Sequence, residues 1–238
     1  MLTPDNAGHA AWVYTSSFGG GLVDGDHQVL NIHVCPGATA WVSTQASTKV
    51  YRSIRGTSTQ VHARVEPGAC LVLAPDPVVC FASSRYRQVQ NIELAAGASL
   101  VLVDWLTSGR HVSGERWAFE EYHAQVRVRQ DGRLIVHDAL ALRAVDGALE
   151  PRLGRWNILG TVVLLGSAVQ NAAAEIAAQV ARDPVVRRAD QIVTATVVGD
   201  GCLLRIAGTS VERVASTVRT HLRFVRRLLG DDPWARKW

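Results

Sequence analysis

Histidine and carboxylate side chains are the groups in this 238-residue chain that could bind a metal ion or transfer protons. None of the eight histidines pairs with another at the spacing that lets one helix face present two ligands. His27 and His33 flank one predicted strand and, six residues apart, point to the same side of it. They could bind a metal only with help from a neighbouring strand. No GxSxG sequence occurs, so a hydrolase nucleophile elbow is not indicated.

A second group of charged residues lies in the stretch GRHVSGERWAFEEY, residues 109–122. Arg110 and Glu115 flank a glycine-containing turn and could form an ion pair, and Glu120 and Glu121 follow closely. Buried carboxylates in a β framework are costly unless they are paired or hydrated. A water-filled interior lined by such groups would suit a cation in transit, whereas tight binding needs more convergent ligands. Ordinary surface charge is the alternative interpretation.

The glycine-rich segment FGGGLVDGD, residues 18–26, could be mistaken for a nucleotide-binding loop. It has no GK[ST] and no G-x-G-x-x-G that opens a helix, and a predicted strand follows it. Its glycines are better suited to a tight turn with positive φ or to a close backbone approach. Asp24 and Asp26 can accept hydrogen bonds from backbone N–H groups of that turn.

Composition limits the class of protein. With 47% hydrophobic residues, the chain can bury one sizeable core. The formal net charge of +4 comes from arginine, since Lys49 and Lys237 are the only lysines, and arginine suits carboxylate or phosphate partners. This charge is too small to indicate a nucleic-acid partner.

The four cysteines are scattered without a CxxC pair, which indicates neither a zinc site nor a disulfide framework. The first residues lack the charged start and apolar run of a signal peptide, and no apolar stretch reaches the ~18 residues of a membrane span. We therefore expect a cytoplasmic protein without a membrane partner.

Residues 10 to about 145 are predicted to form one strand after another. The candidate strands are 27–34, 40–44, 59–65, 70–74, 78–82, 88–94, 99–106, 117–129 and 134–141. Turn signals recur about every ten residues, which is typical of a β-sandwich, barrel or solenoid. Pro36-Gly37-Ala38, Pro67-Gly68-Ala69 and Ala96-Gly97-Ala98 resemble one another and indicate a repeated hairpin or coil.

The pattern changes after Asn157. Apolar residues spaced by three and four predict a helix over about 167–182, and a hairpin is predicted around Gly199-Asp200-Gly201. A final helix is predicted over about 210–229, capped by Thr209 or Ser210. Its arginines either face solvent or contact a partner protein. We expect a single domain, residues 1–238, with a β-rich part (1–145) and a mixed part (146–238).

The order of several short segments carries a resemblance to a known family. The segments are GGxxxGD (Gly20, Gly21, Gly25, Asp26), TQASTKVYR (Thr44 to Arg52), LVLAPDPVVCF (Leu71 to Phe81), GR…GE (Gly109, Arg110, Gly114, Glu115) and PWARKW (Pro233 to Trp238). In this order the chain resembles the urease accessory protein UreD family, called UreH in some bacteria. Asp104 stands where family members often have glutamate, and Val72 where they often have an acid. Only about 18 residues precede Gly19, so the resemblance implies a shortened N-terminus.

The resemblance implies a mainly β fold, a β-helix-like stack of short strands with about two helices near the C-terminus. It implies a chaperone of urease maturation rather than an enzyme. Such a chaperone bridges apo-urease to UreF-type and UreG-type proteins, the latter a GTPase carrying nickel, and offers an internal route for the ion. No tightly bound cofactor and no nucleic-acid partner are implied.

The resemblance also assigns roles to individual residues. Transient nickel contacts would be Asp26, His33, Asp104 and Glu115. Structural or interface roles would fall to Gly20, Gly21, Gly25, Thr44, Gln45, Lys49, Tyr51, Arg52, Gly109 and Arg110.

A β-solenoid that binds or cleaves polysaccharide is the alternative, suggested by the repeated turns and the seven tryptophans. A carbohydrate cleft needs paired carboxylates and exposed aromatic rings on one face. The tryptophans here are spread out, and Trp12, Trp41 and Trp105 lie within apolar strands.

Overall fold

Three similar turns organise the first half of the chain in the computed structural model, which describes residues 1–4, 8–17 and 19–235. Gly37, Gly68 and Gly97 have φ of 69°, 69° and 71°, values that favour glycine. The turns stack, because the N–H of Gly37 donates to the carbonyl of Pro67 at 3.1 Å. Each turn joins a strand of one sheet to a strand of a second sheet, so the repeat predicted from the sequence is the corner of three stacked coils.

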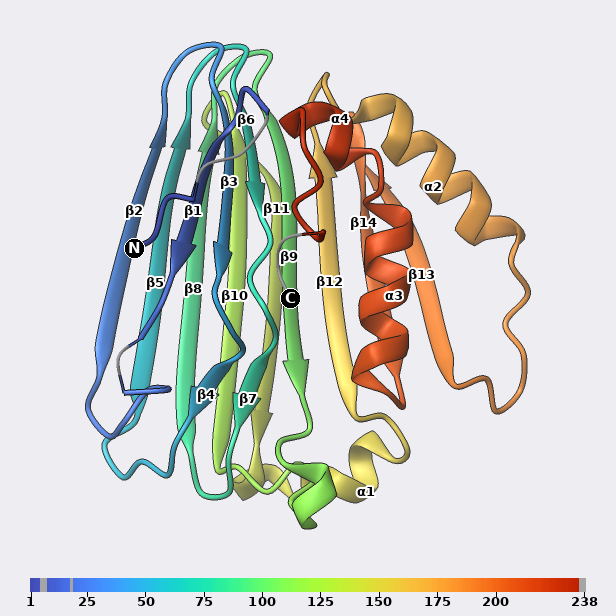
Figure 1. The fold of residues 1–238 in the computed structure, drawn as a ribbon. Coiled ribbons are helices and arrows are strands. Elements are labelled where there is room, and N and C mark those ends of the chain that lie inside the picture. The colour runs from blue at the N-terminus through green and yellow to red at the C-terminus, as the bar shows by residue number, and fades with distance from the viewer. Residues whose placement is uncertain (5–7, 18, 236–238) are drawn as a thin grey trace.

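The strands of these coils run parallel in two sheets that face each other (Figure 1). They are β2 (His27–Val34), β3 (Thr39–Thr44), β4 (Thr48–Val50), β5 (Thr57–Val65), β6 (Cys70–Leu73), β7 (Val78–Cys80), β8 (Arg85–Leu94) and β9 (Ser99–Thr107). The remaining strands are β1 (Ala11–Thr15), β10 (Glu121–Gln130), β11 (Arg133–Arg143), β12 (Ile158–Leu165), β13 (Gln191–Val198) and β14 (Gly201–Gly208). The mainly β, solenoid-like fold expected from the sequence is confirmed.

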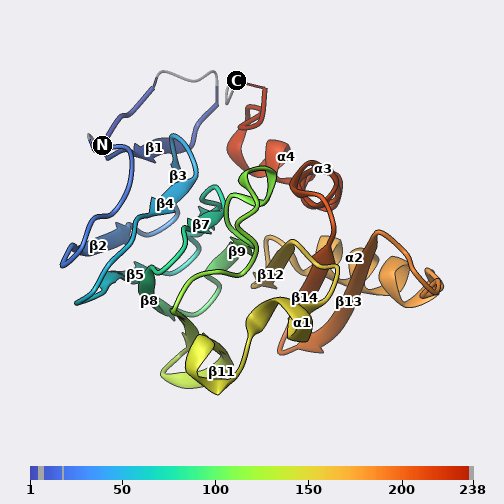
Figure 2. The ribbon, with the colours of Figure 1, turned by 90° about the horizontal axis from the view of Figure 1, so that it is seen from below.

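The large sheet has the order β1-β3-β6-β9-β12-β14-β13, with β4 and β7 pairing beside this path. The small sheet has the order β11-β10-β8-β5-β2. Figure 2, viewed along the strands, shows the two sheets and the helical part beyond them. Because β13 and β14 extend past the small sheet, the two sheets leave an open side next to β11.

The described residues form four α-helices, where the sequence predicts about two. They are α1 (Leu149–Leu153), α2 (Gln170–Arg182), α3 (Val211–His221) and α4 (Val225–Leu229), and two short 3₁₀ turns cover His111–Ser113 and Ala144–Asp146. The helix predicted over 210–229 is divided near Leu222, which allows both Leu222 and Val225 to enter the core completely. Ser210 caps α3 as predicted, since its Oγ accepts from the N–H of Arg213 at 3.3 Å. None of the described helices has the length and apolar character needed to cross a bilayer.

In the second half of the chain the sequence predicts one hairpin correctly but does not predict strand β12. The hairpin around Gly199 is confirmed as β13 and β14. Strand β12 is not predicted, because it lies between β9 and β14 and Val162–Leu165 are buried on both faces, which removes the two-residue alternation. The large sheet packs its outer face against α2, α3 and α4 (Figure 1).

Candidate functional site

Two apolar clusters lie between the sheets. One holds Leu102, Val163 and Leu203 of the large sheet against Ile92 and Val136 of the small sheet. The other holds Leu106 against Tyr86, Tyr122 and Leu142, with Leu149 beneath them. Burial of these side chains keeps the sheets together. Between the clusters lies a layer of polar side chains, which needs a different explanation.

This layer, called the polar layer below, consists of Gln88, Asp104, Asp138, Thr161 and Arg205. Thr161 of β12 is in register with Asp104 of β9 and with Arg205 of β14, so the three side chains occupy one row of the large sheet. Gln88 of β8 and Asp138 of β11 face that row from the small sheet.

Hydrogen bonds connect the polar layer across the gap. Gln88 Nε2 donates to Asp104 Oδ1 at 2.8 Å, and the hydroxyl of Tyr86 donates to Gln88 Oε1 at 3.1 Å. On the other side Thr161 Oγ1 donates to Asp138 Oδ2 at 3.3 Å, and Arg205 forms an ion pair with Asp138. The two carboxylates are therefore held differently: Asp138 has a cation, whereas Asp104 has a neutral amide.

Asp104 has an unusual protonation equilibrium as a result. Its pKa is raised from an ordinary 3.8 to about 6, chiefly because the carboxyl is buried; the hydrogen bond from Gln88 opposes the rise and the nearby Asp138 carboxylate adds to it. Asp104 is thus ionised at neutral pH but at a cost in free energy. A carboxylate kept in such a place is a candidate functional group.

Two cavities open on opposite sides of Asp104. The first, of about 510 Å³, lies toward β3 and β5, and the second, of about 360 Å³, lies toward β11 and β14. Asp104 and Trp105 line both cavities. Asp104 therefore borders both cavities, and the two cavities are together called the passage below.

The lining of this passage limits what it can hold. Among the described residues that line it there is no histidine or cysteine, and its side chains are mainly carboxylates, hydroxyls, amides and apolar groups, with one lysine, one arginine, one methionine and the indole of Trp105. The described residues contain no group of three or more His, Cys, Asp or Glu side chains that could hold a metal. Burial also raises the pKa of Cys80 to about 12, so that nearby thiol stays protonated. Such a lining suits weak, exchangeable contacts with a cation rather than tight binding.

A family model of the UreD urease accessory protein matches residues 1–238. The chain belongs to the UreD family. Urease accessory protein UreD of Sorangium cellulosum is 51% identical over 239 residues, covering 100% of this chain and 76% of that protein. The UreD of an Anaeromyxobacter strain is 45% identical, covering 99% of this chain and 80% of the relative. Urease accessory protein D of Oryza sativa subsp. indica is 30% identical, covering 98% and 87%. Membership of this family supports a role in urease maturation.

The four acid and histidine residues predicted to contact nickel lie apart in this UreD family member. Asp104 lines the passage. His33 lies on the outer face of the small sheet, with its side chain 61% exposed and Nε2 3.0 Å from Glu66. Asp26 accepts from the N–H of Val23 at 2.8 Å within the glycine-rich turn. These roles stay predictions, and the geometry favours Asp104 among them.

Glu115 is held by neighbours outside the passage. Its carboxylate pairs with Arg110 and accepts from the N–H of Ala82 at 3.2 Å, so the ion pair suggested by the sequence is present. The hydrogen bond from Arg110 lowers the pKa of Glu115. Arg110 also stacks on the ring of Phe81, with 4.5 Å from its guanidinium carbon to the ring centre. This arrangement closes the loop after β9 and gives Glu115 a structural task.

Half of the residues with predicted structural or interface roles line the first cavity. They are Gly20, Gly21, Thr44, Gln45 and Lys49. Thr44 Oγ1 donates to Asp76 Oδ2 at 3.1 Å and accepts from the N–H of Asp76 at 2.7 Å, which orders this end of the passage. The first part of the block from Thr44 to Arg52 therefore lines the passage.

The other predicted structural residues pack close by. Tyr51 contacts Phe81 edge-on, with ring centres 5.1 Å apart, whereas Arg52 is exposed. Gly109 has φ of 105°, and a Cβ there would lie 2.8 Å from the carbonyl of Cys80. Gly25 has φ of 89° and lies against the guanidinium of Arg55.

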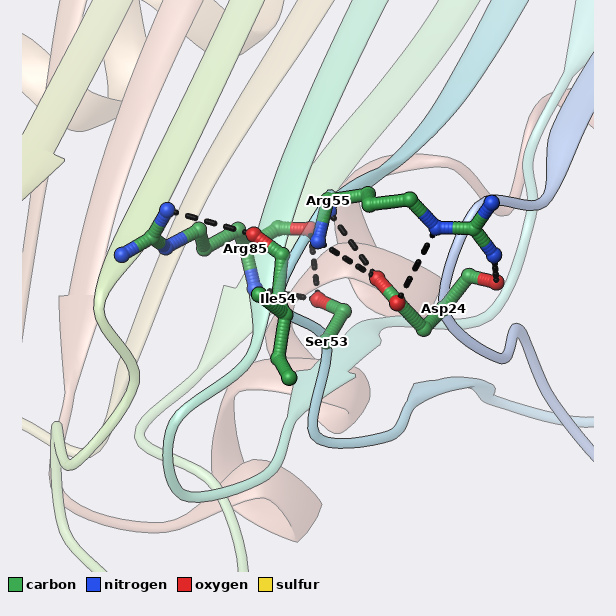
Figure 3. Close-up of polar contacts among 6 residues, drawn as sticks. Asp24, Ser53, Ile54, Arg55 and Arg85 are labelled. Carbon is green, nitrogen blue, oxygen red and sulfur yellow. Dashed lines mark hydrogen bonds and ion pairs between the residues drawn. The ribbon is translucent and has the colours of Figure 1, made fainter.

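Asp24 ties the glycine-rich turn to the next coil, so the backbone donors that it satisfies lie outside its own turn, contrary to the prediction (Figure 3). Its Oδ1 accepts from the N–H groups of Arg55 at 2.7 Å and Gly56 at 3.2 Å. Burial alone would raise the pKa of Asp24, but these bonds and the Arg55 side chain lower it overall. Beside it, Ser53 Oγ accepts from the N–H of Arg85 at 2.8 Å, which links the next pair of coils.

Three of the tryptophans are core residues. Trp12, Trp41 and Trp117 are 2%, 0% and 3% exposed. They cannot supply the exposed aromatic platform that the polysaccharide alternative requires.

The glycines of residues 19–21 should differ sharply in their tolerance of a side chain. We expect Gly21→Ala to cost about 1–3 kcal/mol, because the added Cβ would lie 2.5 Å from the carbonyl of Lys49 and 2.8 Å from the ring of Tyr51. Gly19→Ala is the matched control, since the nearest atom to its Cβ would be 3.9 Å away. Urea unfolding of both variants measures the difference. Equal stability of the two would contradict the packing described here.

Proposed function

We propose that this chain is a non-catalytic chaperone of urease maturation that gives nickel an internal route to apo-urease. Family membership supports the general role. The polar passage, in which Asp104 borders both cavities, is the observation that supports the nickel route.

The chemistry of the passage fits an ion in transit. Nickel(II) binds imidazole and thiolate firmly, whereas single carboxylate, hydroxyl and amide oxygens together with water hold it weakly. One ionised carboxylate that borders both cavities offsets part of the ion's desolvation cost there. The absence of convergent ligands among the described residues leaves the ion free to leave again.

The second cavity has a charged mouth that such an ion must pass. Arg205 is exposed there and pairs with Asp138, which also accepts from Thr161. In the empty passage Arg205 neutralises Asp138. A divalent cation moving outward can replace Arg205 as the partner of Asp138, while the Arg205 side chain turns to solvent.

The partners in this proposal are the urease apoprotein and accessory proteins of the UreF and UreG types, in the cytoplasm. The printed names of the relatives, urease accessory proteins, support a partner within urease maturation. No tightly bound cofactor is part of the proposal, and nickel is cargo.

Co-expression tests the assembly role. The tagged chain is expressed with the host's urease subunits and its UreF-type and UreG-type proteins, and the purified material is analysed for subunit content. We expect urease and at least the UreF-type protein to co-purify. Pure, folded chain with neither partner would overturn the scaffold role.

A further inference from the structure

The outer face of the small sheet is a regular surface that the helices leave uncovered (Figures 1 and 2). Helices α2, α3 and α4 pack on the large sheet, and no helix among the described residues crosses the small sheet's outer face (Figures 1 and 2). Because strand residues alternate, the outward side chains of β2, β5, β8, β10 and β11 form cross-strand rows on this face.

Three successive rows contain no acidic residue. They are His27-Ser58-Arg87-His123-Ala141, Val29-Gln60-Val89-Gln125-Ala139 and Asn31-His62-Asn91-Arg127-His137. We call these fifteen positions the acid-free face. The chain has 21 acidic residues, so their absence here leaves a continuous surface whose only charges are positive.

The two arginines of the acid-free face have no counter-ion within the part of the chain that the structure describes. The side chains of Arg87 and Arg127, which lie on the adjacent strands β8 and β10, form no hydrogen bond or ion pair with another described residue. Arginines at the border of the face are paired instead: Arg64 with Glu66 at 2.7 Å, Arg129 with Glu93 at 3.7 Å and Arg143 with Asp146 at 2.7 Å. The one acid that reaches in from the border is Glu121, 3.0 Å from His123.

The other side chains of the face indicate which kind of anion it suits. The middle row carries Val29, which is 50% exposed, together with Val89 and Ala139, so a partner can bury apolar surface there. None of the fifteen positions is Trp, Tyr or Phe, so single-stranded nucleic acid would lack a large aromatic ring to stack on, and a membrane would lack an interfacial anchor. A flat, pleated face with free guanidinium groups suits carboxylates presented by another protein.

We propose that the acid-free face docks an acidic surface of a protein partner. Arg87 and Arg127 pair with its carboxylates, the histidines and amides donate hydrogen bonds, and Val29 and Val89 contact its apolar atoms. This inference goes beyond the nickel route and relies on the proposed function only for the choice of natural partners.

A charge-reversal pair tests the docking. Arg87→Glu/Arg127→Glu changes the face, and Arg219→Glu/Arg223→Glu on the opposite side of the molecule changes the net charge equally. A labelled poly-glutamate peptide is the first probe. We expect the face variant to weaken its binding about tenfold or more and the control less than about threefold, with the wild-type affinity falling as salt increases. Equal weakening by both variants would overturn the proposal.

Purified apo-urease and the UreF-type and UreG-type proteins are the second probes. We expect one of them to lose at least about tenfold in affinity for the face variant, whose thermal unfolding should match the wild type. If every partner that binds the wild type also binds the face variant with wild-type affinity, the docking proposal is overturned. A loss of affinity that occurs only in the control variant would overturn it as well. If none binds even the wild type, the proposed function fails and the peptide result alone decides this inference. Loss of binding to anionic vesicles, with the peptide unaffected, would assign the face to a membrane and also overturn the proposal.

Discussion

Asp104→Asn should raise the free energy of unfolding at about pH 8 by as much as about 3 kcal/mol. The reason is that the native pKa of Asp104, about 6, lies above its ordinary value of 3.8. Between these values the native protein keeps the proton that the unfolded chain has lost, so stability falls as the pH rises through this range. Above about pH 6 the full penalty is present, and the neutral amide removes it.

Urea unfolding at about pH 5 and about pH 8 measures this effect. The wild type should lose stability between the two, and the Asp104→Asn variant should lose less. Glu120→Gln serves as the control, because Glu120 is exposed and its change should stay within about 0.5 kcal/mol. A destabilised Asp104→Asn variant with an unchanged pH profile would contradict the environment assigned to Asp104.

The predicted gain in stability has a functional meaning. A buried carboxylate that weakens the fold at neutral pH is a cost that packing alone does not explain. It borders both cavities, and its partner is an amide rather than a cation. The charge is therefore left available to an incoming cation.

Trp41→Ala should be the most damaging single core change that we predict, with a loss of about 3–5 kcal/mol. Trp41 is completely buried and contacts Trp12 of β1, with ring centres 6.3 Å apart, and Trp234 near the C-terminus, with ring centres 5.7 Å apart. The substitution leaves a cavity at the place where the first strands and the C-terminal segment meet.

Thermal and urea unfolding of Trp41→Ala and Trp41→Phe check this prediction. Phenylalanine retains part of the ring contact, so its cost should be clearly smaller. If both variants unfold like the wild type, the C-terminal segment does not pack on β3 in the way described.

The coiled part of the fold could be predicted because its signals are local. The turns at Gly37, Gly68 and Gly97 repeat in sequence, and β2, β5 and β8 show the two-residue alternation expected of strands with one exposed face. Strand β12 gives no such signal because both of its faces are buried. Its position between β9 and β14 depends on pairing between distant segments.

The same reason explains which site residues the sequence missed. The family resemblance points to Asp104 and to the block from Thr44 to Arg52. The sequence does not predict Asp138, Thr161 and Arg205 as site residues, because their meeting depends on the register of β9, β12 and β14 and on the way the sheets face each other. A polar residue at an inward position of a predicted strand, such as Gln88 in β8, was the one signal available.

The nickel content of urease matured with Asp104→Leu tests the nickel route most directly. Leucine has the same branched shape as aspartate, with somewhat larger terminal groups, but puts an apolar side chain without charge at the border of the two cavities. Nickel per urease and urease activity are measured after co-expression with all accessory proteins, together with recovery of the complex. We expect the complex to assemble and the nickel content to fall about tenfold or more, since an ion would cross this border without a counter-charge. Wild-type nickel content in urease assembled with this variant would contradict a route through Asp104.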